Sequence, residues 1–138
     1  ASSTALALKA VLAPITMLED ATVPRPRLAE MVDRIDAIAA RHDVVCATFG
    51  HAGDGNLHPT IVFDHDDGDA RHRAEAAFSD VFDAAIELGG TITGEHGVGA
   101  AKRPYLERRL GADQMALLRR LKAAFDPAGI LNPGKLGS

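Results

Sequence analysis

The sequence predicts an α+β fold of the ferredoxin-like type, with a βαββαβ order, an antiparallel sheet and its helices on one face. Two segments show apolar residues at helical spacing, and short β-rich runs precede and follow each of them. The length of 138 residues suits one domain with a single core. We expect C-terminal helices to follow this pattern.

The first strand and the first helix are predicted in the N-terminal part of the chain. Residues 14–20 are apolar and compatible with a strand, and Pro24 and Pro26 prevent that strand from running directly into a helix. In residues 27–41, apolar side chains recur every three or four positions, with charged side chains between them. This pattern is typical of an amphipathic helix.

A β-hairpin is predicted next. Residues 44–49 and residues 57–63 are both β-rich, so each is expected to form a strand. The segment between them contains Asp54-Gly55, which is a strong turn signal. The two runs should therefore pair directly with each other.

A second helix, a fourth strand and two C-terminal helices complete the prediction. Apolar residues keep helical spacing through residues 74–88, until Gly89 and Gly90 end the pattern. Residues 91–93 have the composition of a short strand that leads into a glycine-rich segment. The C-terminal helices are expected at residues 101–110 and 113–125.

Composition and charge exclude several classes of protein. A formal net charge of -4, with basic residues scattered along the chain, provides no positive surface for a nucleic acid. The longest apolar stretch, residues 5–17, contains Lys9 and Pro14 and is shorter than the roughly 20 residues that span a bilayer. The lone Cys46 excludes an intrachain disulfide framework, so we expect a buried thiol and a reducing, cytoplasmic setting.

Two histidines flank the predicted hairpin turn. His51 and His58 would have Cβ atoms about 5 Å apart if they were directly opposed across paired strands, and two imidazoles at that distance can bind one metal ion. Glu95 and His96 follow the predicted fourth strand among glycines. If that strand end faces the hairpin, Glu95 would complete a His-His-Glu set.

The spacing alone leaves a plainer interpretation open. His51 and His58 would then be ordinary histidines at the edge of a loop, and Glu95 and His96 would form a solvated corner. The clustering of three of the six histidines with several glycines in two short segments favours the metal site enough to keep both interpretations.

Other polar residues are assigned to the surface. His42, His65 and His72 lie in predicted turns or at a helix start among polar neighbours, and we expect them to be solvated. Lys102 and Arg103 lie at the start of a predicted helix. Solvation is the simpler interpretation of this basic pair, and contact with an anionic substrate is the alternative.

Two motifs resemble the paired signatures of the FAD-linked oxidase C-terminal domain. They are FGHAGDGNLHP at residues 49–59 and GEHGVG at residues 94–99. The resemblance extends to residues 19–24 and 125–135, and it covers about residues 14–136. The family includes D-lactate dehydrogenases, the flavin subunit of glycolate oxidase and D-2-hydroxyglutarate dehydrogenase, all flavoproteins of the vanillyl-alcohol-oxidase type. The resemblance implies an FAD-dependent oxidoreductase that oxidises a D-2-hydroxy acid to the 2-keto acid.

The same resemblance implies roles for the site residues. His51, His58 and Glu95 match the ligands of a divalent metal, zinc or manganese, and His96 matches the catalytic base. A metal bound to the carboxylate and hydroxyl oxygens of the substrate would ease removal of the hydroxyl proton by an imidazole, while hydride leaves Cα for flavin N5. Asn132 is similar to a family residue that lies near the flavin.

The resemblance also implies a domain organisation. Residues 1–13 are expected to be an N-terminal segment, disordered or displaced, and residues 14–136 to be part of the cap domain. The flavin-binding domain of the family is absent from this sequence, so FAD would be bound mainly by the missing domain and the chain alone is expected to be inactive. Apolar surface that packs on the missing part would favour a homo-oligomer. An electron-acceptor partner would link this cytoplasmic protein to a membrane.

Two other functions stay open on the sequence alone. A flavin-free metalloprotein such as a hydrolase would use metal-bound water, with His96 or Asp54 moving protons. A non-catalytic interaction module would retain the fold without the chemistry. The coding sequence upstream of this chain would separate these alternatives from the flavoenzyme.

Overall fold

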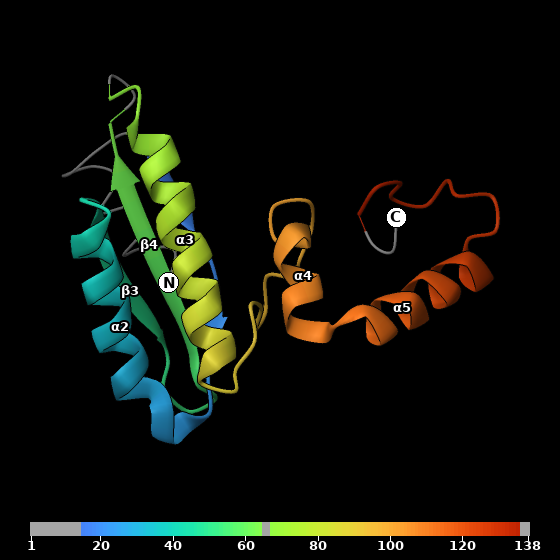
Figure 1. Ribbon diagram of the computed structural model, residues 1–138, viewed down its shortest axis with the longest axis horizontal. Helices are drawn as coiled ribbons and strands as arrows, with labels where there is room; N and C mark the ends of the chain where they lie inside the picture. The colour runs from blue at the N-terminus through green and yellow to red at the C-terminus, as the bar shows by residue number, and fades with distance from the viewer. Residues whose placement is uncertain (1–14, 65–66, 136–138) are drawn as a thin grey trace. The chain divides into compact units, whose positions relative to one another are not determined.

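The computed structural model describes residues 15–64 and 67–135 of the protein. The predicted N-terminal segment 1–13 and His65 lie outside the described residues. The chain forms two compact units, one that ends at His96 and one that begins at Gly97. Figure 1 shows the helices and strands of both units.

The sheet of the N-terminal unit is built around β4 (Asn56–Phe63). One edge of β4 pairs with β3 (Val45–His51), as predicted for the hairpin. The other edge pairs first with β1 (Ile15–Leu18) and then with β2 (Ala21–Thr22). All of these pairs are antiparallel, so the predicted α+β class is confirmed.

The strand predicted at residues 14–20 forms β1, and a second short strand, β2, follows just beyond it. Glu19 donates its N–H to the carbonyl of Pro59 at 3.3 Å, but Pro59 has no N–H to donate in return. The ladder of hydrogen bonds is therefore interrupted between Leu18 and Ala21, at the position of Asp20. The sequence did not indicate this break because it depends on the strand that lies opposite.

The predicted strand at residues 91–93 is wrong. Among the described residues, a single antiparallel bridge forms there, between Thr22 and Thr91. The backbone N–H groups of residues 94–96 donate to the carboxylate of Asp20, so they are not available for a strand. The bridge still places this segment beside β2. The segment therefore takes the place that the fourth strand has in a ferredoxin-like sheet.

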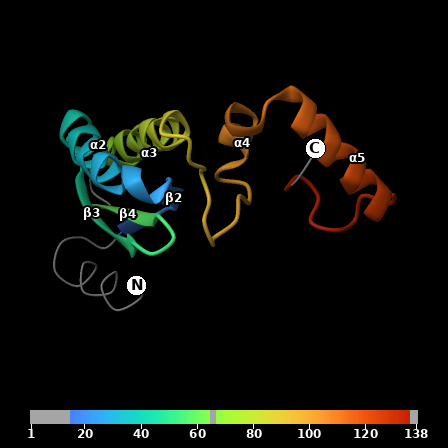
Figure 2. The ribbon, with the colours of Figure 1, turned by 90° about the horizontal axis from the view of Figure 1, so that it is seen from below.

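Two helices cover one face of the sheet (Figures 1 and 2). α2 (Leu28–Arg41) follows a short 3-10 turn at Arg25–Arg27, and α3 (Ala70–Glu87) follows the hairpin. Both predicted helices are confirmed, and α3 begins at Ala70, before the apolar pattern that predicted it. The apolar side chains that α2 buries are Met31, Ile35 and Ile38, and those that α3 buries include Phe78, Val81 and Phe82.

The glycine pair after α3 allows the chain to return closely to the sheet. Gly89 has a φ of 80°, which favours glycine, and a Cβ atom at position 90 would lie 2.0 Å from the carbonyl oxygen of Thr22. The predicted end of the helix at this pair is confirmed. Its consequence is that residues 91–96 run beside β2.

His42 is only partly solvated, with its side chain 21% exposed. Its Nε2 lies 2.6 Å from Oδ2 of Asp80, and Arg41 donates to the same oxygen at 2.7 Å. These contacts join the C-terminal end of α2 to α3. The local sequence around His42 does not reveal that α3 lies beside it. The side chain of His72 is 79% exposed, as predicted.

The C-terminal unit contains α4 (Arg103–Leu110) and α5 (Ala112–Phe125), close to the predicted positions. Lys102 is buried, which contradicts the expected solvation, whereas Arg103 is exposed and donates to the carbonyl of Gly134 at 2.7 Å. None of the described helices is both long and apolar enough to cross a membrane.

Candidate metal centre

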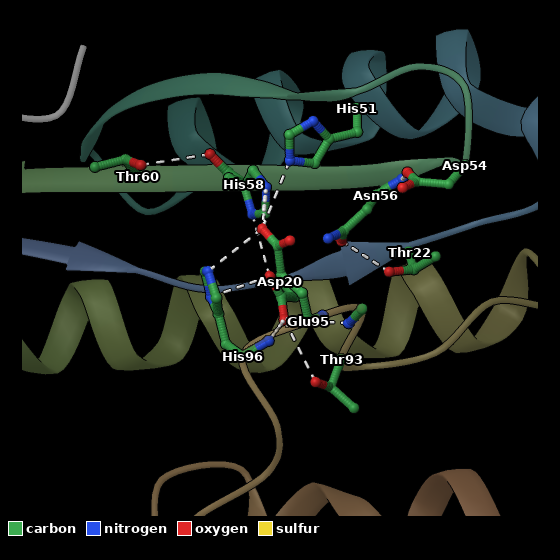
Figure 3. A network of polar contacts seen from close by, with 11 residues as sticks. Asp20, Thr22, His51, Asp54, Asn56, His58, Thr60, Thr93, Glu95 and His96 are labelled. Atoms are coloured by element: carbon green, nitrogen blue, oxygen red, sulfur yellow. Dashed lines mark hydrogen bonds and ion pairs between the residues drawn. The ribbon is translucent and has the colours of Figure 1, made fainter. Parts of the chain in front are cut away.

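His58 is the most enclosed side chain of the candidate site. It lies on β4, and its side chain is only 1% exposed. Three rings surround it: His96 is stacked at 5.1 Å between centroids, His51 meets it edge-on at 5.3 Å, and Phe49 lies at 5.8 Å. Packing on several sides leaves the His58 imidazole little freedom to turn. Figure 3 shows His51 and His96 on either side of the Glu95 carboxylate, close to His58.

The two hairpin histidines are close together but are not directly opposed. Phe49 is the residue opposite His58, whereas His51 lies opposite Asn56. They are diagonal to each other because β3 continues as far as His51, so that the turn contains only residues 52–55. Diagonal neighbours on one sheet face are still within reach of large side chains, so the two imidazoles meet.

Glu95 faces three imidazoles at once. Its Oε1 lies 3.2 Å from Nε2 of His58, 3.6 Å from Nε2 of His51 and 3.8 Å from Nε2 of His96. The structure thus brings together the four residues to which the sequence assigned metal binding and base catalysis (Figure 3). They come from the hairpin and from the segment beyond α3.

Asp20 is part of the same cluster and was not predicted as a site residue. Its fully buried carboxylate places Oδ1 3.1 Å from Nδ1 of His58 and 3.0 Å from Nδ1 of His96. Its Oδ2 accepts hydrogen bonds from the backbone N–H groups of residues 94–96 at 3.1, 3.1 and 2.8 Å. One sequence signal was available, because Asp20 follows an apolar run that forms a strand, and a buried charge needs partners.

The residues of the cluster fit a divalent metal ion. Within residues 15–64 and 67–135, the buried Nε2 of His58 has no hydrogen-bond partner, although the Glu95 carboxylate lies 3.2 Å away. A tetrahedral zinc ion with bonds of about 2.0–2.1 Å separates its ligand atoms by about 3.3 Å. The distances of 3.2 and 3.6 Å from Glu95 to His58 and His51 are close to that separation, and His96 lies slightly farther away at 3.8 Å. Imidazole nitrogen and carboxylate oxygen are also suitable donors for zinc.

A small polar cavity adjoins the cluster. It has a volume of about 150 Å³, and its lining includes Asp54, Asn56 and Glu95. Asn56 accepts a hydrogen bond from the Thr22 hydroxyl at 2.8 Å, and it packs against Gly94, where a Cβ atom would lie 2.4 Å from its side chain. This packing holds the 93–96 segment close to the hairpin.

Asn132 belongs to the C-terminal unit, where it adopts a positive φ of 47° after α5. Asparagine tolerates this backbone region better than most residues, so a turn accounts for its conformation. The cluster in the N-terminal unit is complete without Asn132, and its contact with a flavin stays a prediction.

Fold and site together define an α+β domain that presents a cluster of histidine and carboxylate side chains at one side of an antiparallel sheet. The chain belongs to the family of FAD linked oxidases, C-terminal domain, whose sequence pattern matches residues 3–136. The match begins eleven residues before the boundary expected at position 14.

Curated relatives carry names that agree with this family. The chain is 57% identical over 136 residues to the glycolate oxidase subunit GlcD of Bacillus subtilis, which covers 99% of this chain and 29% of that protein. It is 40% identical over 120 residues to the mitochondrial D-lactate dehydrogenase (cytochrome) of Arabidopsis thaliana, which covers 87% of this chain and 21% of that protein. It is 39% identical over 132 residues to the D-lactate dehydrogenase of Anaerostipes hadrus, and this match covers 94% of this chain and 28% of that protein. The chain therefore spans less than a third of the length of these relatives.

Proposed function

We propose that this chain is the metal- and substrate-binding part of an FAD-dependent dehydrogenase or oxidase. The complete enzyme would oxidise a D-2-hydroxy acid of the lactate, glycolate or 2-hydroxyglutarate type to the 2-keto acid. Support comes from the FAD linked oxidase family and from relatives named glycolate oxidase and D-lactate dehydrogenase. In this proposal His51, His58 and Glu95 hold zinc or manganese.

The observation that carries the proposal is the approach of three imidazoles to one carboxylate. Nε2 atoms of His51, His58 and His96 all lie between 3.2 and 3.8 Å from Oε1 of Glu95. The buried Nε2 of His58 costs free energy unless it is satisfied, and a cation shared with His51 and Glu95 would satisfy it.

His96 is the base in this proposal. Its Nδ1 lies 3.0 Å from the Asp20 carboxylate, so Nδ1 donates and Nε2 is left to accept the proton of the substrate hydroxyl. Asp20 would then stabilise the imidazolium that forms. A divalent ion would draw electron density from the hydroxyl oxygen, and the flavin of the complete enzyme would accept hydride from Cα.

The exposure of the four side chains suits this division of roles. His58 is buried and provides a fixed anchor, whereas the side chains of His51, Glu95 and His96 are 52%, 51% and 39% exposed. A small hydroxy acid could therefore approach from the side of these three residues.

Other parts of the proposal concern the cofactor and the partners. Asn132 would contact the flavin, which the remainder of the complete protein would mainly hold. The exposed apolar side chains of α5 would support a homo-oligomer. The single Cys46 suits a reducing cytoplasm, and an electron acceptor would provide any link to a membrane.

The flavin-free alternatives have less support. A hydrolase would use the same metal cluster, but the family that matches residues 3–136 is one of FAD linked oxidases. A non-catalytic module would have no need for a buried imidazole whose Nε2 lacks a hydrogen-bond partner.

The first test is the metal content of the chain purified without chelator or a histidine tag. We expect about one equivalent of zinc or manganese in the wild type and its loss in His58→Ala. His72→Ala is the matched control, because His72 is exposed and lies outside the cluster. A folded wild-type chain that stays empty when either metal is added would contradict the proposed site in this chain.

The second test uses the complete protein encoded by the gene, assayed with D-lactate, glycolate and D-2-hydroxyglutarate and a dye as electron acceptor. His96→Gln should lower kcat by about 10²- to 10⁴-fold, the usual contribution of a general base, while the metal is retained. Turnover close to that of the wild type would remove His96 from the base role. Absence of bound flavin and of turnover in the complete wild-type protein would favour the flavin-free alternatives.

A further inference from the structure

We infer that Asp20 is a positioning residue that orients the candidate ligands from behind and does not itself bind the metal. The geometry of this inference is independent of the proposed function, although its consequence for metal affinity rests on that proposal. Asp20 lies between β1 and β2, and its carboxylate is fully buried.

The hydrogen bonds of Asp20 leave it no capacity for a metal. Oδ1 faces Nδ1 of His58 and Nδ1 of His96, and Oδ2 accepts three backbone N–H groups and lies 3.4 Å from the hydroxyl of Thr93. A carboxylate offers about four lone-pair positions, and all are used by these donors. Although Asp20 lies within 4.8 Å of potential ligand atoms of His58, Glu95 and His96, it therefore belongs to the outer layer of the site.

The same contacts determine which nitrogen of each imidazole carries the proton. An ionised carboxylate can only accept, so Nδ1 of His58 donates its hydrogen bond to it, and Nδ1 of His96, which lies 3.0 Å from the same oxygen, is placed to donate as well. In a neutral imidazole the other nitrogen then has the free lone pair. Asp20 thus directs the Nε2 lone pairs of both rings away from itself and toward the side where Glu95 lies. Carboxylates that accept from metal-binding histidines have this effect in metalloproteins generally.

Asp20 also holds the backbone that carries Glu95. Three successive N–H groups, at residues 94–96, point at the one oxygen Oδ2, and such convergent groups form a concave site for an anion. Asp20 therefore positions the imidazoles of His58 and His96 by contacts with their rings, and it positions Glu95 by a hydrogen bond with its backbone. His51 makes its contacts with Glu95 and His58 instead.

The first experiment requires no variant and no metal. The ring nitrogens of the six histidines are observed by ¹⁵N NMR in the metal-free 138-residue chain at neutral to mildly alkaline pH. We expect His58 and His96 to be in the Nδ1–H form, whereas free histidine favours the other tautomer. An Nε2–H form, or an average of the two forms, at either ring in the folded protein would overturn the inference.

The second experiment measures zinc affinity in Asp20→Asn. The amide replaces one acceptor oxygen with a donor. The side chain at position 20 can then no longer accept hydrogen bonds from both the imidazole rings and the backbone N–H groups. We expect zinc to bind about 10- to 100-fold more weakly, with an altered absorption spectrum of the cobalt-substituted protein. Glu19→Gln is the control, since it removes the same charge from the adjacent position. Its affinity should stay within about two-fold of the wild type.

The possible outcomes separate the two proposals. A folded Asp20→Asn protein with wild-type zinc affinity would overturn the positioning role. If Asp20→Asn does not fold, the tautomers of the wild-type rings decide the question. If the wild type binds no zinc, the metal site fails, whereas the tautomers still show whether Asp20 orients both rings.

Discussion

The side chains of the cluster are closely packed, and Gly94 shows how little space remains. A Cβ atom at position 94 would lie 2.4 Å from the side chain of Asn56, which itself accepts a hydrogen bond from the hydroxyl of Thr22. The absence of a side chain at Gly94 therefore allows the 93–96 segment to approach the hairpin.

Gly94→Ala should destabilise the chain and disturb the site. Because the added methyl must displace Asn56 or the 93–96 segment, we expect a loss of about 1–3 kcal/mol in the free energy of unfolding, measured by urea denaturation. Gly53→Ala is the matched control, since a Cβ there meets no atom within 4 Å. Equal stability of the two variants would contradict the close approach.

Cys46 should react slowly with thiol reagents. Burial is the main cause that raises the pKa of its thiol above the ordinary value, so less of the reactive thiolate is present at a given pH. We expect the folded protein to react more slowly than the same protein unfolded in urea, with the difference decreasing as the pH rises. Equal rates in both states at pH 8 would show that the thiol is not protected.

The helices α2 and α3 are joined by a polar contact at one end. A hydrogen bond from His42, together with one from Arg41, lowers the pKa of the Asp80 carboxyl below its ordinary value. A carboxyl whose pKa is lower in the folded than in the unfolded protein stabilises the folded state at pH values above its pKa in the unfolded protein. This stabilisation is lost as the pH falls through the pKa of the carboxyl in the folded protein.

Asp80→Asn should therefore lower stability at pH 7 but not in acid. We expect a loss of less than about 1 kcal/mol, because the ion pair is partly exposed to water. The difference from the wild type should shrink below about pH 4, near the ordinary pKa of an aspartate. Asp33→Asn, at an exposed position on α2, is the control in urea denaturation at several pH values. A difference that grows in acid would contradict the sign of this linkage.

The local pattern of each element explains why most of them were predicted. Helical spacing and turn residues depend on neighbours in the chain, so α2, α3 and the hairpin could be identified from the sequence. The absence of a strand at residues 91–93 could not be recognised from the local pattern. The backbone N–H groups of the next residues, 94–96, donate to Asp20, which is more than 70 residues away in the sequence, so the pairing is not continued there.

In the C-terminal unit, apolar side chains remain exposed. Leu117, Leu121 and Phe125 recur every four residues and lie on one face of α5, and the side chain of Phe125 is 82% exposed. An apolar stripe of this kind is a common feature of surfaces that bind protein. It supports the expected self-association of the chain.

The double variant Leu121→Glu and Phe125→Glu should reduce self-association. We expect the wild type to show a molar mass above that of one 14.5 kDa chain as its concentration rises, whereas the variant stays monomeric because charge opposes burial of the stripe. Light scattering after size exclusion measures this difference, with the exposed Arg120→Gln as control. A wild type that is monomeric at every concentration would contradict the homo-oligomer.

The sequence by itself determined the α+β class, the positions of the main helices and the family. It also identified His51, His58, Glu95 and His96 as candidates, because they lie in two short motifs that are recognisable without coordinates. Only the tertiary structure decided that His51 is diagonal to His58 and that Asp20 contacts both His58 and His96. These contacts join segments far apart in the chain, and periodicity and motifs carry no information about which distant groups will share a hydrogen bond.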